Sequence, residues 1–135
     1  MAFSPSGAIL AAADTDKGIA YIFDTDTGRE TGTAPFHQGQ SIAEISSDGT
    51  LMLVRDERGA EVIDIPSGRS LWRFTADSTE FMRFSPDGRF LMQWTRNGTA
   101  IWPARPQLLL EWAASLIQRD APVLTAEESR EYGLD

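Results

Sequence analysis

The feature that most constrains this chain is an internal repeat. The segments Phe-Ser-Pro-Ser-Gly, Ile-Ser-Ser-Asp-Gly and Phe-Ser-Pro-Asp-Gly end at Gly7, Gly49 and Gly88, about forty residues apart. A second motif, two apolar residues followed by Asp or Pro, keeps nearly the same step and begins at Ile22, Val62 and Ile101. Because two independent motifs share one period, the chain is a repeat protein over its first three quarters.

Each repeat divides into short apolar runs separated by turn residues. In the second repeat these runs cover residues 42–45, 51–54, 61–65 and 71–74. The Gly, Asp and Ser residues between them supply the positive φ angles and local hydrogen bonds of tight turns. Each repeat is therefore predicted to form a four-stranded antiparallel sheet. The third repeat follows the pattern as far as Trp102, after which Pro103 and Pro106 interrupt the expected fourth strand.

A forty-residue unit of four strands with an Asp-Gly turn after the first is typical of a β-propeller blade. The sequence resembles the WD-repeat (WD-40) family, because residues 84–88 match the end of that family's first strand and Phe23-Asp24 and Ile63-Asp64 stand at its Trp-Asp dipeptide. The resemblance implies an all-β fold of about three four-stranded antiparallel blades in an incomplete ring. The expected units are a partial propeller over 1–104, with blades at about 1–40, 41–79 and 80–104, and a short α-helical C-terminal tail over 105–135.

The resemblance also implies a larger ring. Aligning the first and third repeats places Met1 on Met82, so the sequence begins within a first strand. In the WD-repeat family the last blade takes its outer strand from the amino-terminal end. Since closed rings use roughly 4 to 8 blades, we expect these to be the last three of a longer series. Open blade faces and edges predict that the chain self-associates or belongs to a longer polypeptide.

The tail has helical spacing. Between Pro106 and Arg119 the apolar residues form one stripe, which is expected to pack on the last blade: Leu109, Trp112, Ala113, Leu116 and Ile117. A capping box from Thr125 to Glu128 predicts a second short helix. The tail is similar to the helical ending of bacterial WD-repeat proteins whose propeller follows a signalling NTPase, protease or TIR-type module. That similarity implies a sensor rather than an effector.

Charge and composition exclude several classes of function. Twelve Lys and Arg stand against 20 Asp and Glu, a net charge of -8, which repels nucleic acid and anionic membrane surfaces. The lack of cysteine, with His37 as the single histidine, excludes disulfides, thiol catalysis and zinc sites built from Cys and His. No signal-peptide pattern or apolar run of about 20 residues is present, so a cytoplasmic protein is expected.

One segment imitates a metal site. The run Asp24-Thr-Asp-Thr-Gly28 looks like the opening of a calcium loop, but its twelfth position is Pro35 and not the required glutamate. The matching turn of the second repeat, from Asp64 to Gly68, drops the second carboxylate. A structural turn is therefore favoured. With no Gly-x-Ser-x-Gly elbow and no phosphate-binding glycine loop, we expect no catalytic, cofactor-binding or metal-binding residue, and no enzyme.

The four tryptophans are expected to pack in the core rather than serve as stacking platforms for ligands. Three of them lie on predicted strands and the fourth lies on the apolar face of the predicted helix: Trp72, Trp94, Trp102 and Trp112.

The connections at one end of the repeats remain as a recognition surface, because loops on a rigid scaffold are where such folds carry binding. The candidate protein-binding residues are His37, Gln38, Arg55, Glu57, Arg58, Asp77, Arg96 and Asn97. Their mixed charge favours a polypeptide partner. The predicted function is a non-catalytic protein-protein interaction or sensor scaffold, the C-terminal part of a larger WD-repeat propeller, bound to a protein partner or to N-terminal blades not present here. Two alternatives stay open: a homo-oligomeric propeller that binds a peptide or small ligand, and the accessory propeller of a hydrolase or peptidase.

Overall fold

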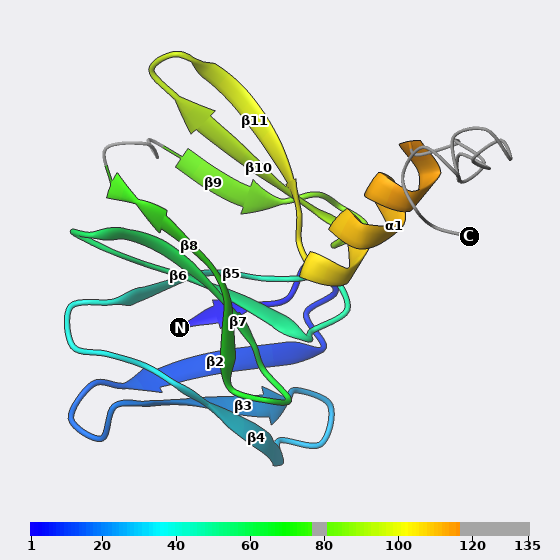
Figure 1. Ribbon diagram of the computed structural model, residues 1–135. Helices are drawn as coiled ribbons and strands as arrows, with labels where there is room; N and C mark the ends of the chain where they lie inside the picture. The colour runs from blue at the N-terminus through cyan, green and yellow to red at the C-terminus, as the bar shows by residue number, and fades with distance from the viewer. Residues whose placement is uncertain (77–80, 117–135) are drawn as a thin grey trace, which may run out of the picture.

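Three antiparallel sheets follow one another along the chain and a single helix comes after them (Figure 1). The computed structural model describes residues 1–76 and 81–116. Within these ranges the predicted mostly-β architecture of successive antiparallel sheets with a helix behind the last one is confirmed. No helix of the described residues is long and apolar enough to cross a membrane.

The strands occur in chain order within each sheet. The first sheet contains β1 (Ala2–Phe3), β2 (Ile9–Asp14), β3 (Ile19–Asp24) and β4 (Glu30–Pro35). The second contains β5 (Ser41–Ile45), β6 (Leu51–Asp56), β7 (Gly59–Asp64) and β8 (Arg69–Thr75). The third contains β9 (Phe81–Phe84), β10 (Phe90–Thr95) and β11 (Gly98–Pro103), and the helix is α1 (Pro106–Leu116).

The repeated serine-containing turn makes the same hydrogen bonds in successive sheets. In the second sheet the Ser46 hydroxyl accepts a bond from the Leu51 amide at 2.9 Å and donates one to the Asp48 carboxylate at 2.5 Å. In the third sheet the Ser85 hydroxyl accepts from the Phe90 amide at 3.0 Å. The sequence motif therefore marks the point where the first strand of each sheet turns back into the second.

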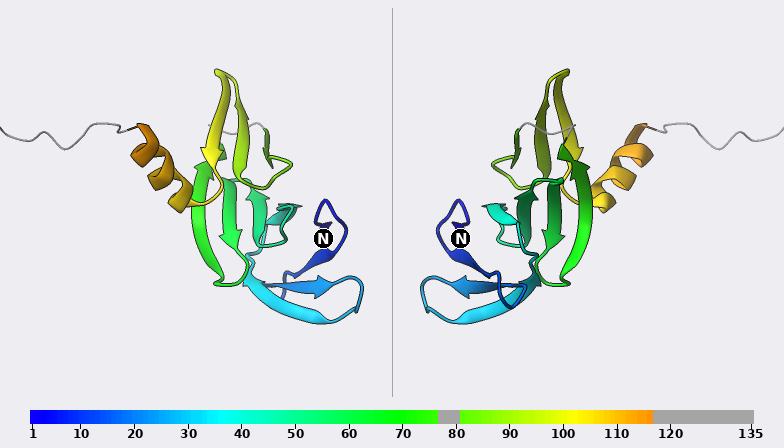
Figure 2. Two further views of the ribbon diagram at one scale, coloured as in Figure 1. Left: turned by 90° about the vertical axis from the view of Figure 1, so that its right-hand side faces the viewer. Right: turned by 90° about the vertical axis from the view of Figure 1, so that its left-hand side faces the viewer.

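The second sheet lies between the other two, and its strand β6 is buried on both faces (Figure 2). Met52 and Val54 belong to a core cluster shared with the first sheet, whereas Leu51 and Leu53 belong to one shared with the third. This explains the unbroken apolar run in the sequence, because successive side chains of a strand point to opposite faces. Within residues 1–76 and 81–116, the first and third sheets each pack against another sheet on one face only.

The short strand β5 joins the stack along one side. It contacts β1 and β2 of the first sheet and β9 of the third. There the Glu44 carboxylate accepts a hydrogen bond from the Phe84 amide at 2.9 Å. The first strands of all three sheets therefore gather on the same side of the stack.

The helix departs from expectation. It begins at Pro106, a favourable first position. The ring of Trp112 lies 5.4 Å from that of Phe90, yet Leu109 is 46% and Leu116 83% exposed, and no helix residue is buried. The prediction that the whole stripe packs on the last sheet is wrong, because the helix projects away from the sheets after its first turns (Figure 2). Ile117 and the second predicted helix lie outside the described residues.

The tryptophans are less buried than expected. Trp72 and Trp102 form an aromatic cluster with Phe74 between β8 and β11, with the Phe74 and Trp102 ring centroids 5.6 Å apart. Trp94 is 36% exposed and Trp112 is 44% exposed. The prediction that Trp94 packs in the core is wrong, because Trp94 lies on the face of the third sheet that no other sheet of the described residues covers.

Candidate functional site

A groove of about 740 Å³ lies between the β4–β5 connection and the β6–β7 hairpin. Four of the eight predicted recognition residues line it: His37, Gln38, Glu57 and Arg58. All four side chains are exposed. The structure therefore brings together residues from two neighbouring sheets, at one end of the stack.

The β4–β5 connection is held as a compact turn. Phe36 anchors it, being 1% exposed, and its amide donates to the Gly18 carbonyl at 3.0 Å. The His37 amide donates to the Gln40 side-chain oxygen at 2.9 Å, and the Gln40 amide donates back to the His37 carbonyl at 3.1 Å. These bonds present His37 and Gln38 to solvent on a defined backbone.

The opposite wall is the β6–β7 hairpin. The Asp56 carboxylate accepts hydrogen bonds from the amides of Arg58 at 2.8 Å and Gly59 at 3.0 Å. The Arg58 carbonyl in turn accepts from the amide of Ala76 at 2.8 Å. The hairpin is thus tied to the end of β8, and the side chains of Glu57 and Arg58 are exposed along the groove.

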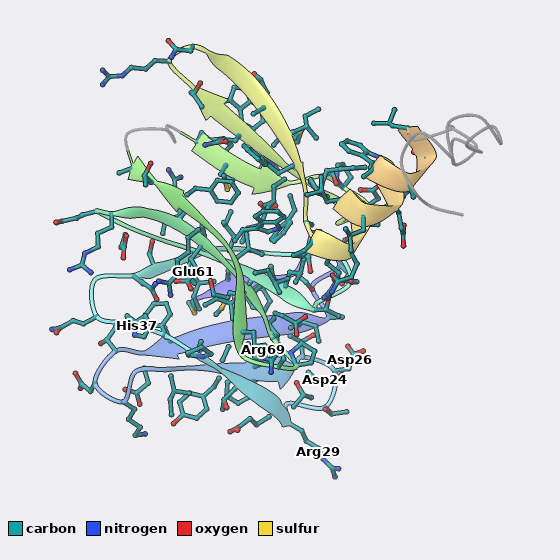
Figure 3. The ribbon with its side chains drawn as sticks, in the orientation of Figure 1. Asp24, Asp26, Arg29, His37, Glu61 and Arg69 are labelled. Carbon is teal, nitrogen blue, oxygen red and sulfur yellow. The ribbon has the colours of Figure 1, made fainter. Side chains whose placement is uncertain are left out.

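An ion pair between Glu61 on β7 and Arg73 on β8 also lines the groove. The Glu61 carboxylate, 13% exposed, accepts two bonds from the Arg73 guanidinium at 3.2 and 3.1 Å. Its second oxygen accepts from the Gln40 side-chain amide at 3.4 Å. Glu61 therefore connects the second sheet to the β4–β5 connection, and Figure 3 places it beside His37. A guanidinium has five N–H donors, and the bonds to Glu61 come from two of the nitrogens of Arg73. The remaining donors of this 74% exposed side chain, which lines the groove, are available to a ligand.

The sequence analysis did not single out Glu61 or Arg73 as recognition residues. No motif marks the pair. The turn pairs Asp64 with Arg69 and Ile63 with Ser70, and only a register shift between Val62 and Ile63 brings Glu61 opposite Arg73. Gln40 was within the expected connection but was not singled out.

The other predicted residues lie elsewhere. Arg55 lines a separate hollow of about 410 Å³ beside the first strands of the second and third sheets, together with Glu44 and Arg83. Arg96 and Asn97 are exposed in the β10–β11 turn and do not line the groove. Asp77 lies outside the described residues.

The calcium-like segment is a hydrogen-bonded turn. The Asp24 carboxylate accepts from the Thr27 amide at 2.8 Å and from its hydroxyl at 2.7 Å, and these bonds lower the pKa of Asp24. The Asp64 carboxylate is bonded in the same way by Ser67. Figure 3 shows Asp24 and Asp26 at the opposite end of the stack from His37. Within the described residues no group of three or more His, Cys, Asp or Glu is placed to hold a metal ion.

Comparison with known proteins identifies a likeness of fold. No protein-family model and no curated protein matches the sequence. Among similar solved structures is a crystal structure of the eukaryotic initiation factor, with a TM-score of 0.62 and 15% sequence identity. The match covers 75% of this chain and 27% of the other. The chain therefore spans about a quarter of the length of that relative, and at this identity the likeness concerns the fold alone.

Proposed function

We propose that this chain is a non-catalytic protein-interaction scaffold formed by three blades of a WD-repeat propeller. The observation that carries the proposal is the groove at one end of the stack, in which connections of two neighbouring sheets present polar side chains on a buried, rigid framework. Binding residues commonly lie on loops that a rigid scaffold of sheets holds in place.

The propeller part of the proposal rests on the repeat. Three successive sheets have the same strand order and the same Ser-containing turn, and they stack in chain order. A similar arrangement occurs as part of a longer solved chain. Since closed rings contain roughly 4 to 8 blades, these three would join further blades.

The chemistry of the groove favours a polypeptide ligand. Arg58 and Arg73 offer hydrogen-bond donors, Glu57 offers acceptors, and Val54 and Phe74 add apolar lining. A volume of about 740 Å³ accommodates a short peptide segment, and peptides supply both the donors and the acceptors that such a mixed surface needs.

A site-specific crosslinking experiment tests the groove. A photoreactive amino acid placed at Gln38 should crosslink to a discrete protein partner in cells, whereas the same group at Arg29, at the opposite end, should not. Arg58→Glu should abolish the Gln38 crosslink by reversing a groove charge. Equal crosslinking from both positions, or none from Gln38, would rule the groove out as the binding site.

The genomic sequence tests whether further blades precede these three. Sequence in frame upstream of Met1 should encode further forty-residue repeats with Asp-Gly turns. An upstream region without such repeats would remove the larger ring from the proposal and leave the groove to be judged by crosslinking alone.

A further inference from the structure

One guanidinium of the groove is held in a defined orientation. The Nε and Nη2 atoms of Arg73 both donate to the same carboxylate oxygen of Glu61, at 3.2 and 3.1 Å. Glu61 is positioned in turn, because it belongs to β7 and its other oxygen accepts a hydrogen bond from the Gln40 side chain at 3.4 Å. Contacts within the protein therefore set the orientation of Arg73 before any ligand arrives.

The hydrogen bonds to Glu61 use only one edge of this guanidinium. The group is planar, and its five N–H donors have a fixed geometry. Nε and Nη2 form the side edge, so the end edge, with one N–H from each terminal nitrogen, points away from Glu61. Because the side chain of Arg73 is 74% exposed and lines the groove, a ligand can reach that end edge. Two parallel N–H donors match the two oxygens of a carboxylate.

The other charges of the groove are compatible with an anionic ligand group. The carboxylates of Asp56 and Glu61 already accept hydrogen bonds within the protein. Arg58 is exposed on the hairpin wall, and no ion pair holds it within the described ranges, so it adds a second cation. Glu57 beside it is the opposing charge. At about 0.15 M salt, repulsion by the net charge of -8 is screened beyond roughly 8 Å, so contacts inside the groove decide.

The groove begins where the packing between the first two sheets ends. Gly59, Glu61 and Ile63 share one face of β7, because alternate residues of a strand point the same way. Ile63 is buried in the core shared with the first sheet, whereas Gly59 has no side chain and lines the groove. The volume of about 740 Å³ at this point exceeds what a single acidic side chain fills, so a carboxylate reaches Arg73 as part of a longer ligand.

We infer that the peptide ligand of this groove is acidic, and that an Asp or Glu side chain of the ligand accepts two hydrogen bonds from the end edge of Arg73. Glu61 is then a positioning residue, which orients the guanidinium without contacting the ligand. The inference rests on the proposed function, because it specifies the class of peptide that the same groove binds.

A peptide selection identifies the preferred ligand. Random heptapeptides displayed on phage and selected on the 135-residue chain should be enriched in Asp or Glu at one position. The enrichment should be lost with Arg73→Gln and retained with Arg69→Gln, because Arg69 lies at the start of the same strand and does not line the groove. Circular dichroism verifies that each variant is folded. Enrichment in basic or only apolar residues, or no enrichment, would overturn the inference.

An enriched peptide then tests the contact itself by calorimetric titration. Replacing its acidic residue with the corresponding amide should weaken binding about 10-fold or more. The same peptide change should have little further effect on Arg73→Gln, because its hydrogen-bond partner is already absent. Arg73→Lys should recover little of the affinity, since lysine keeps the charge but not the paired donors. Additive effects of the two changes, or full recovery by lysine, would overturn the contact.

Two adjacent residues of the hairpin provide a measurement that leaves the ion pair of Glu61 and Arg73 intact. Glu57 and Arg58 are both exposed and both line the groove. Arg58→Gln should weaken binding of the acidic peptide about 2-fold or more, and Glu57→Gln should strengthen it by a similar factor, as expected for exposed charges. The opposite order, or no change in either variant, would overturn an acidic ligand.

Crosslinking from Gln38 in cells remains the separate test of the proposed function. A discrete crosslinked partner, together with a groove that selects no acidic peptide, would overturn this inference alone. Selection of acidic peptides without any crosslink from Gln38 would overturn the proposed cellular function alone.

Discussion

The guanidinium of Arg105 lies 2.8 Å from the carboxylate of Asp64, although 41 residues separate them in the chain. The second terminal nitrogen of Arg105 donates to the Thr50 hydroxyl, also at 2.8 Å. Arg105 directly precedes α1, whereas in the second sheet Asp64 is the last residue of β7 and Thr50 directly precedes β6. The start of the helix is therefore fastened to the neighbouring sheet by two hydrogen bonds.

Arg105→Gln should lower the free energy of unfolding by about 1–2 kcal/mol, because it removes a charge-assisted bond to Asp64 that is only partly screened by solvent. Arg69→Gln, a change of an exposed arginine at the start of β8, is the matched control and should alter stability by less than about 0.5 kcal/mol. Urea unfolding monitored by circular dichroism measures both. An equal loss of unfolding free energy in the two variants would show that the hydrogen bonds of Arg105 do not stabilise the fold.

The same contact makes stability depend on pH. The Ser67 hydroxyl and the Arg105 guanidinium lower the pKa of Asp64 below its usual 3.8. The folded carboxyl therefore binds a proton less readily than the unfolded one, and its stabilising contribution is present above pH about 4 and lost as the pH falls through the lowered pKa. Denaturation curves between neutral and acidic pH should show a smaller acid loss for Asp64→Asn. An unchanged acid loss would contradict the assignment to Asp64.

The repeat made most of the fold predictable, because its turns depend on local chemistry. Ser46 and Asp48 bond within their own turn, so the sequence motif alone marks the reversal of the chain. The groove depends instead on contacts between segments. Gln40 directly precedes β5, so its side chain meets Glu61 of β7 only once β5, β6 and β7 have paired, and no local pattern contains that distance.

Burial was harder to predict than strand positions. Trp94 has the alternation of a core strand residue, but its face is buried only when another sheet covers it. The apolar stripe of α1 fits helical spacing equally well on a packed and on a projecting helix. Periodicity identifies which residues share a face, and it does not identify what covers that face.

The hairpin wall of the groove depends on Gly59. Its φ of 141° is a conformation that L side chains rarely adopt, and an added Cβ would lie 1.9 Å from the Phe74 carbonyl oxygen. Gly98, in the corresponding turn of the third sheet, has a similar φ of 135° but nothing within 4 Å of an added Cβ.

Gly59→Ala should therefore destabilise the protein by about 3 kcal/mol or more, whereas Gly98→Ala should cost only the backbone strain of about 1–2 kcal/mol. The difference between the two variants in urea unfolding isolates the steric clash. If both cost the same, backbone conformation alone would account for the glycine at position 59.

The aromatic cluster between the second and third sheets contains two tryptophans with different hydrogen bonding. The indole nitrogen of Trp102 donates to the side-chain oxygen of Gln93 at 2.7 Å. The indole nitrogen of Trp72 is buried and has no hydrogen-bond partner within the described part of the chain. A buried donor without a hydrogen bond costs free energy. The ring of Trp72 therefore stabilises the cluster by packing, but the desolvation of its N–H group reduces that gain.

Trp102→Phe should consequently lower the free energy of unfolding by about 1 kcal/mol more than Trp72→Phe, since only the former loses a hydrogen bond. Packing alone predicts the opposite order, because Trp102 is 37% exposed and Trp72 is the more buried of the two. Thermal and urea unfolding of the two variants measure the difference. A larger loss for Trp72→Phe would mean that ring packing, and not the bond to Gln93, determines what each indole contributes to this cluster.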